Sequence, residues 1–228
     1  MPEITRLHLA SLVVGGARWP VHGFVVTYRG GPHGTGESVG AILVDTGVGG
    51  PQDVLDDWRV VNRTVADALA EIDMSPADIS MVINTHLHFD HCGQNAVFSN
   101  AACHVQRAEL DRAKREEPEL YDWFGFAGAR WELLDGDAEL APGVRVIATP
   151  GHTSGHQSVL ISSADGTPDI LIGDAAYTDV QYGEPPADAE LPTGQAADPV
   201  AWRGSLSRIK AIDRARVHFC HDTSVVHG

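Results

Sequence analysis

The sequence predicts an α/β fold in which two β-sheets carry helices on their outer faces. Short apolar runs typical of strands are grouped in two parts of the chain, and helical segments lie between and after them. Gly/Pro-rich turns, such as residues 29–36, separate the first strands. The 228 residues are enough for a large core, and no Gly/Ser linker or charge block divides them. We therefore expect a single domain over residues 1–228.

The individual elements follow from apolar periodicity. We expect strands at 7–14, 23–28, 39–44, 79–84, 103–105, 144–148, 158–161, 169–172 and 216–220. Helices are expected at 60–72, 106–117 and 200–212. In the first of these, Val61, Val65, Ala68, Leu69 and Ile72 share one helical face. The Pro- and Ala-rich segment 184–199 is expected to be a long loop that forms a wall of a pocket.

Composition and charge exclude several classes of function. The formal net charge of −15 would repel a polyanion, so we expect no nucleic-acid partner. The longest apolar runs are far too short to cross a bilayer, and the N-terminus lacks an export signal, which predicts a cytoplasmic protein with no membrane contact. The odd number of cysteines, three, indicates reduced thiols rather than a disulfide scaffold.

Residues 85–93 read THLHFDHCG and concentrate side chains that bind metals. Residues two apart in an extended segment point the same way, so His86 and His88 can share one metal, while Asp90 and His91 can face a second one. Three imidazoles and a carboxylate would be costly to bury without such a partner. Three further candidates each follow a predicted strand: His152 in the 149–156 turn, Asp174 as a bridging carboxylate, and His221. Side chains at the ends of several strands can converge on one site.

Other polar residues have simpler interpretations. We expect His8, His22, His33, His104, His218 and His227 to be surface or hydrogen-bonded histidines. Asp45 is expected to form a turn or to support the ligands. Cys92 and Cys220 flank candidate ligands, but we interpret them as thiols outside the metal shell. Nitrogen and oxygen donors suffice for two divalent ions, most simply Zn²⁺, with iron, cobalt or manganese as alternatives.

Five motifs together resemble the metallo-β-lactamase fold superfamily over nearly the whole chain: VDTG at 44–47, THLHFDHCG at 85–93, TPGHTSGH at 149–156, GDAAYT at 173–178 and CHD at 220–222. The resemblance implies a four-layer αββα sandwich with the metals between the sheet edges. It also implies that His86, His88 and His152 bind the first metal, that Asp90, His91 and His221 bind the second, and that Asp174 bridges them. His156 is then structural.

Within that superfamily the chain is most similar to the N-acyl homoserine lactonases. The similarity rests on Phe89 inside HLHFDH, VQRAEL at 105–110, the run 136–161 and Tyr177 three residues after Asp174. It implies a small lactone substrate contacted by Tyr177 and Phe89, and a monomer or homodimer. Segment 48–59 is shorter than in those lactonases and loop 184–199 is longer; within the short segment, Trp58 is expected to supply an apolar wall.

Such a site predicts a hydrolase. Two divalent cations lower the pKa of a shared water toward about 7, which supplies a hydroxide at neutral pH. Tyr177 is expected to donate a hydrogen bond to the developing oxyanion, and Asp90 to pass a proton to the leaving alkoxide.

Alternatives remain on the residues alone. They are a glyoxalase-II-like thioesterase or other small-ester hydrolase, a β-lactam hydrolase, and a metal-binding module without catalysis. A flavodiiron-type reductase would need a carboxylate at His88, and a nuclease of this fold would need basic extensions.

Overall fold

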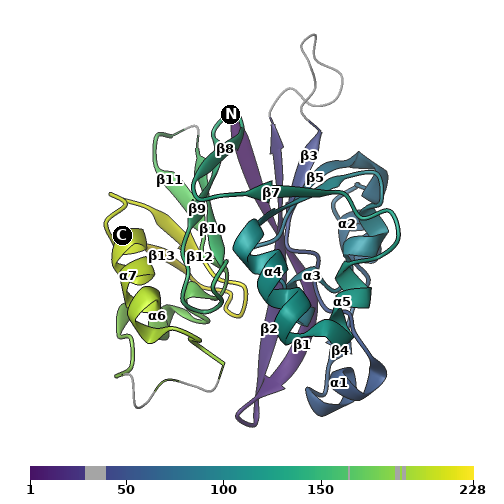
Figure 1. Cartoon of the computed structure of the whole chain (residues 1–228). Helices are drawn as coiled ribbons and strands as arrows, with labels where there is room; N and C mark the ends of the chain where they lie inside the picture. The colour runs from purple at the N-terminus through teal and green to yellow at the C-terminus, as the bar shows by residue number, and fades with distance from the viewer. Residues whose placement is uncertain (29–39, 164, 188–190, 192–193) are drawn as a thin grey trace.

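The computed structural model describes residues 1–28, 40–163, 165–187, 191 and 194–228. Its layers run helix, sheet, sheet, helix, as predicted (Figure 1). In the described part of the chain, the first sheet has the order β4 (Val61–Asn62), β1 (Pro2–Val14), β2 (Ala17–Tyr28), β3 (Ala41–Val44), β5 (Ile79–Ile83), β6 (Ala102–Gln106) and β7 (Trp131–Leu134). The second has the order β13 (Val225–His227), β12 (Arg216–His218), β11 (Pro168–Leu171), β10 (Gln157–Ser162), β9 (Val144–Ala148) and β8 (Ala138–Ala141).

The helices lie on the outer faces of the two sheets (Figure 1). The first sheet carries α2 (Val65–Ala70), α4 (Arg107–Glu116) and α5 (Pro118–Phe124), with α1 (Gln52–Asp57) beyond one end and the single turn α3 (Phe89–Cys92) beside the site. The second sheet carries α6 (Asp179–Gly183) and α7 (Pro199–Lys210). Short 3-10 turns occupy Pro76–Asp78, Asn95–Phe98 and Gly173–Ala175. None of the helices that the structure describes is long and apolar enough to span a bilayer.

One part of the core lies between the sheets. Phe24 and Ile42 of the first sheet pack with Val146 and Val159 of the second, and all four are buried. Removing these apolar side chains from water is the main force that holds the sheets face to face. A second cluster packs Trp202 and neighbouring α7 residues on the outer face of the second sheet.

The predicted helix at 60–72 is wrong in its first part. Val61 and Asn62 pair with Ser11 and Ala10 of β1, so this stretch forms the edge strand β4. Thr64 then caps α2, because its side chain accepts a hydrogen bond from the Asp67 N–H at 3.0 Å. Val61 is 60% exposed, so it does not join the buried helical face.

Other boundaries differ in smaller ways. The last predicted strand, 216–220, ends at His218, because the chain turns to the first sheet and the Cys220 carbonyl accepts from the His22 N–H at 2.9 Å. A further strand, β13, then pairs antiparallel with β12. The start of the predicted strand 39–44 and the turn 29–36 lie wholly or partly outside the described residues. The other expected strands and the helices at 106–117 and 200–212 are present, with ends shifted by a few residues.

Candidate metal centre

The seven predicted ligands come from loops at one edge of the two sheets. His86, His88 and the turn α3 follow β5, His152 follows β9, Asp174 follows β11, and His221 follows β12. Because β3 runs parallel to β5, and β11 parallel to β12, their carboxyl ends meet at this edge. The prediction that every candidate follows a strand is confirmed.

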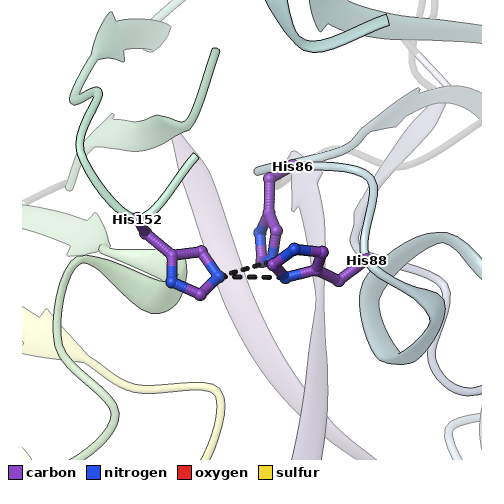
Figure 2. Close-up of side chains that lie close together, drawn as sticks. All are labelled: His86, His88 and His152. Atoms are coloured by element: carbon purple, nitrogen blue, oxygen red, sulfur yellow. Dashed lines mark hydrogen bonds between the residues drawn. The ribbon is translucent and has the colours of Figure 1, made fainter. Parts of the chain in front are cut away.

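Three histidine nitrogens form the first group (Figure 2). His86 Nε2 lies 2.9 Å from His88 Nδ1, and His152 Nε2 lies 3.1 Å from His86 Nε2 and 3.0 Å from His88 Nδ1. The three rings meet at nearly right angles, with interplanar angles of 85 to 88°. Their nitrogens therefore point to one common position from three directions.

The second group lies beside the first and shares Asp174 with it. Asp174 Oδ1 is 3.2 Å from His91 Nε2 and 3.3 Å from His221 Nε2, and Asp90 Oδ2 is 3.7 and 3.6 Å from the same two nitrogens. Asp174 Oδ2 faces the first group, at 3.4 Å from His152 Nε2 and 3.8 Å from His86 Nε2. One carboxylate thus presents one oxygen to each group, as the bridging role requires.

The outer nitrogens of these rings have partners that fix where the ring proton sits. His152 Nδ1 donates to the Gln195 carbonyl at 3.0 Å, and His221 Nδ1 donates to the Pro20 carbonyl at 2.9 Å. His91 Nδ1 donates to Asp45 Oδ2 at 2.9 Å. In a neutral imidazole whose Nδ1 carries the single N–H, the lone pair is on Nε2, which is the atom that faces the site in these three rings.

Two buried atoms at the centre, His91 Nε2 and Asp174 Oδ1, lie 3.2 Å apart but make no hydrogen bond of good geometry with each other or with any other described residue. Leaving buried polar atoms unpaired is costly, and a divalent cation would satisfy both. Converging imidazole nitrogens and carboxylate oxygens are the donor set that zinc prefers. The residues present therefore fit two metal ions.

Burial and nearby charges shift the histidine pKa values in opposite directions in the two groups. Burial and the neighbouring imidazoles lower the pKa of His86 and His88 well below its usual value, and burial also lowers the pKa of His152. Burial acts the same way on His91 and His221, but the Asp174 and Asp90 carboxylates outweigh it and raise their pKa. The second group thus lies in a negative potential that favours a cation.

Asp45 and Glu109 hold the ligand loops from outside. Asp45 accepts hydrogen bonds from the Thr85 N–H and from His91 Nδ1, which agrees with its expected supporting role. Glu109 of α4 is fully buried; its Oε1 accepts from the Leu87 N–H at 3.0 Å, and its Oε2 accepts from the Gly155 N–H at 3.2 Å. One side chain therefore ties the His86–His88 loop to the His152 turn.

Segment 184–199 contributes to the centre through Gln195. Its carbonyl accepts from His152, and its side-chain Nε2 donates to the Asp174 carbonyl at 3.0 Å. Its Oε1 accepts from Gln181 Nε2, and Gln181 Oε1 accepts from the Tyr177 N–H at 2.6 Å. Gly194, in the described part of this segment, lines the cavity, as expected, and Gln195 fixes two candidate ligands; residues 188–190 and 192–193 lie outside the described part.

The cysteines are thiols that form no disulfide, as predicted. All three are free and buried. Burial raises the pKa of Cys220 to about 12, and burial raises the pKa of Cys92 well above its usual value, so both thiols stay protonated in the metal-free protein. Cys220 Sγ lies 3.8 Å from Asp45 Oδ2, outside the converging nitrogens.

The remaining histidines stay apart from the two groups. Of those in the described part of the chain, His218 bonds Asp169 at 2.7 Å, and His156 accepts from the Asp174 N–H at 3.0 Å. The second contact fits the structural role expected of His156. His8, His22, His104 and His227 belong to neither candidate metal group. His33 lies outside the described residues.

A cavity of about 330 Å³ opens onto both groups. Its walls include Trp58, Phe89 and Tyr177, the three residues expected to bind substrate. The Trp58 and Phe89 ring centroids are 5.7 Å apart, while the Tyr177 ring stands edge-on to His152 and His221, one from each group. Burial, with Asp174 and Asp90, raises the pKa of Tyr177, so its hydroxyl stays protonated.

Sequence reasoning missed other wall residues, among them Trp19 and Glu117. Trp19 of β2 packs edge-on against Tyr177 at 5.4 Å, which continues the aromatic wall. Glu117 follows α4; burial raises its pKa, and the nearby Arg112 opposes that shift. The only local signal for Trp19 was a large aromatic residue near a hairpin turn.

Comparison with known proteins agrees with this geometry. The model of the metallo-beta-lactamase superfamily matches residues 38–221. An N-acyl homoserine lactonase from Bacillus sp is 32% identical over 207 residues, covering 83% of this chain and 79% of the relative. The N-acyl homoserine lactonase AttM from Rhizobium radiobacter is 30% identical over 230 residues, covering 92% and 81%.

Solved structures give the same result. A quorum-quenching N-acyl homoserine lactone lactonase superimposes with a TM-score of 0.77 and 26% identity, over 96% of this chain and 92% of the other. An N-acyl homoserine lactone hydrolase with N-hexanoyl-L-homoserine bound at its catalytic metal centre has a TM-score of 0.75 and 25% identity, over 97% and 93%.

Proposed function

Because this chain belongs to the metallo-beta-lactamase superfamily and is a metal-dependent hydrolase, we propose that it opens the lactone ring of N-acyl homoserine lactones or a related small lactone. The observation that carries the proposal is Asp174, whose two oxygens face two separate groups of histidine nitrogens beneath one cavity. The similarity to lactonases over most of the chain supports the substrate class.

The metal ligands are part of the proposal. His86, His88 and His152 would hold one cation, Asp90, His91 and His221 the other, and Asp174 both. We propose zinc because the donors are nitrogen and oxygen. When bound, the two cations supply a hydroxide at neutral pH and polarise the lactone carbonyl.

The side chains around the cations perform the remaining work. The protonated Tyr177 hydroxyl donates a hydrogen bond to the carbonyl oxygen as negative charge develops there. Asp90, which lines the cavity, passes a proton to the alkoxide oxygen that leaves when the ring opens. Trp58 and Phe89 exclude water and hold the apolar part of the substrate.

The oligomeric state and the cellular location are also part of the proposal. We propose that the chain acts in the cytoplasm as one domain over residues 1–228, as a monomer or homodimer. The net charge of −15 supports a small-molecule substrate rather than a nucleic acid.

The test measures proton release by metal-loaded protein supplied with N-acyl homoserine lactones of short and long chain, with a glutathione thioester in parallel. We expect metal-dependent ring opening that Asp174→Asn abolishes together with binding of at least one metal. Asp213→Asn, at an exposed position in an ion pair with Arg214, is the matched control and should change neither. Hydrolysis of the thioester alone, or full activity and metal content in Asp174→Asn, would contradict the proposal.

A further inference from the structure

The cavity contains one carboxylate that the metal arrangement does not use. Of the three acidic residues among its described lining, Asp90 and Asp174 face the histidine nitrogens of the two groups. Glu117 instead lines the cavity at the end of α4, near the outer nitrogen of His88, with its side chain 24% exposed. A charged group in a largely apolar pocket needs a partner.

One oxygen of the Glu117 carboxylate already has a hydrogen-bond partner. Its Oε2 accepts from Arg112 Nη1 at 3.0 Å, and Arg112 Nη2 in turn donates to the buried Glu109 at 2.8 Å. Since Arg112 is itself nearly buried, this pair of contacts fixes the position of the Glu117 side chain.

The other carboxylate oxygen, Oε1, can accept a hydrogen bond from a ligand. Glu117 Oε1 lies 3.9 Å from His88 Nε2, beyond hydrogen-bond distance, and no other described residue donates to it. The lining of the same cavity includes the apolar side chains of Phe89 and Leu120. With the Arg112 contact on Oε2, Oε1 can accept a hydrogen bond from an N–H donor of a ligand in the cavity.

Resting on the proposed function, we propose that Glu117 Oε1 accepts a hydrogen bond from the amide N–H of the substrate, and so selects N-acyl amino lactones over lactones that lack this group. A wall that holds an unpaired acceptor favours a substrate with the matching donor. It disfavours a substrate that displaces water from the acceptor without replacing the hydrogen bond. The amide takes no part in ring opening, so the contact is present before and during the reaction and acts on KM rather than on kcat.

The experiment compares N-hexanoyl homoserine lactone with γ-decanolactone, which has a lactone ring and an alkyl chain but no N–H. In Glu117→Gln, the amide oxygen can keep the Arg112 contact, and its NH₂ group then faces the substrate N–H. We divide kcat/KM for N-hexanoyl homoserine lactone by kcat/KM for γ-decanolactone. We expect this ratio to fall about 10-fold to 100-fold, mainly because KM for the amide substrate rises. Glu117→Ala, which removes the acceptor without adding a donor, should lower the same ratio.

Two controls separate recognition from support of the metal site. Glu119→Gln removes the same charge at an exposed position of α5 and should leave the ratio at its wild-type value. Metal content and thermal unfolding of each variant show whether the centre is intact. Equal losses on both substrates, or loss of metal in Glu117→Gln, would overturn the inference and assign Glu117 to the support of His88.

The wild-type arm tests the proposed function separately. Wild-type protein that opens both lactones while Glu117→Gln keeps the wild-type ratio would overturn the selectivity inference alone. Wild-type protein that opens neither would overturn the proposed function and this inference with it.

Discussion

Replacing Glu109 by Gln tests whether one buried side chain holds both ligand loops together. Glu109 Oε1 accepts from the Leu87 N–H and from two nitrogens of Arg112, at 2.8 to 3.0 Å. Its Oε2 accepts from the Thr153 hydroxyl at 2.6 Å and the Gly155 N–H at 3.2 Å. Gln has the same shape but supplies one NH₂ group where Glu supplies an oxygen, so at least one donor must lose its acceptor.

The magnitude follows from the less costly placement of that NH₂ group. At the Oε2 position it can donate to the Thr153 hydroxyl, which rotates to accept, but the buried Gly155 N–H is left unpaired at about 1–3 kcal/mol. The bonds from Arg112 also weaken when their acceptor loses its charge, although Glu117 still pairs with that guanidinium. We expect a total loss of about 2–4 kcal/mol in the free energy of unfolding.

Urea unfolding of the metal-free protein, followed by circular dichroism, measures this loss as a lower midpoint. Competition with a chelator should show metal affinity reduced by about 10-fold, because loosened loops present His86, His88 and His152 less accurately. Asp111→Asn, at an exposed position on the same helix, is the control. A stability change below about 0.5 kcal/mol in Glu109→Gln with an unchanged chelator midpoint would refute the reasoning.

Three further predictions address the catalytic hydroxyl, the loop and pH. Tyr177→Phe should lower kcat about 10-fold to 100-fold while both metals stay bound, since it deletes one hydrogen bond to a developing charge; unchanged kcat would contradict the donor role. Gln195→Ala leaves the Asp174 carbonyl and Gln181 Nε2 without their partner and should cost about 2–3 kcal/mol in urea unfolding, whereas wild-type stability would show that the loop does not brace the centre. Burial, then Arg6 and His8, lower the pKa of His22 to about 4, so between pH 6.5 and 4 the unfolded chain binds a proton that the folded chain does not. The contribution of His22 to the stability of the metal-free protein should therefore fall as pH drops through that window, by about 3 kcal/mol or less, and the same slope in His22→Asn would contradict this assignment.

The ligand positions could be predicted because their signals are local. Each candidate follows an apolar run directly, and a strand that ends at a sheet edge delivers its next residues to that edge. The two-residue spacing of His86 and His88 is enough to aim both rings at one point, and the structure places their nitrogens 2.9 Å apart.

The missed elements depend on contacts with distant segments. Residues 60–64 have an apolar pattern compatible with a helix, yet Val61 and Asn62 become an edge strand because β1 offers unpaired backbone groups there. Helix α1 has no buried residue, so it shows no apolar stripe. β13 is three residues long and forms only because β12 is available as a partner. For β4 and β13, tertiary pairing decided what local preference left open.

Glu117 shows why substrate selection is harder to predict than metal binding. It lies in a run of acidic residues, EEPE at 116–119, that is typical of a solvated helix end. The i, i+3 spacing of Glu109 and Arg112 was visible in the sequence, but the consequence was not. Only the anchoring of α4 through the Leu87 N–H turns this helix end toward His88 and the cavity. Few residue types can bind a cation, so a metal ligand can be recognised from its residue type. A residue of the cavity wall can be of almost any type, and its role depends on where the fold places it.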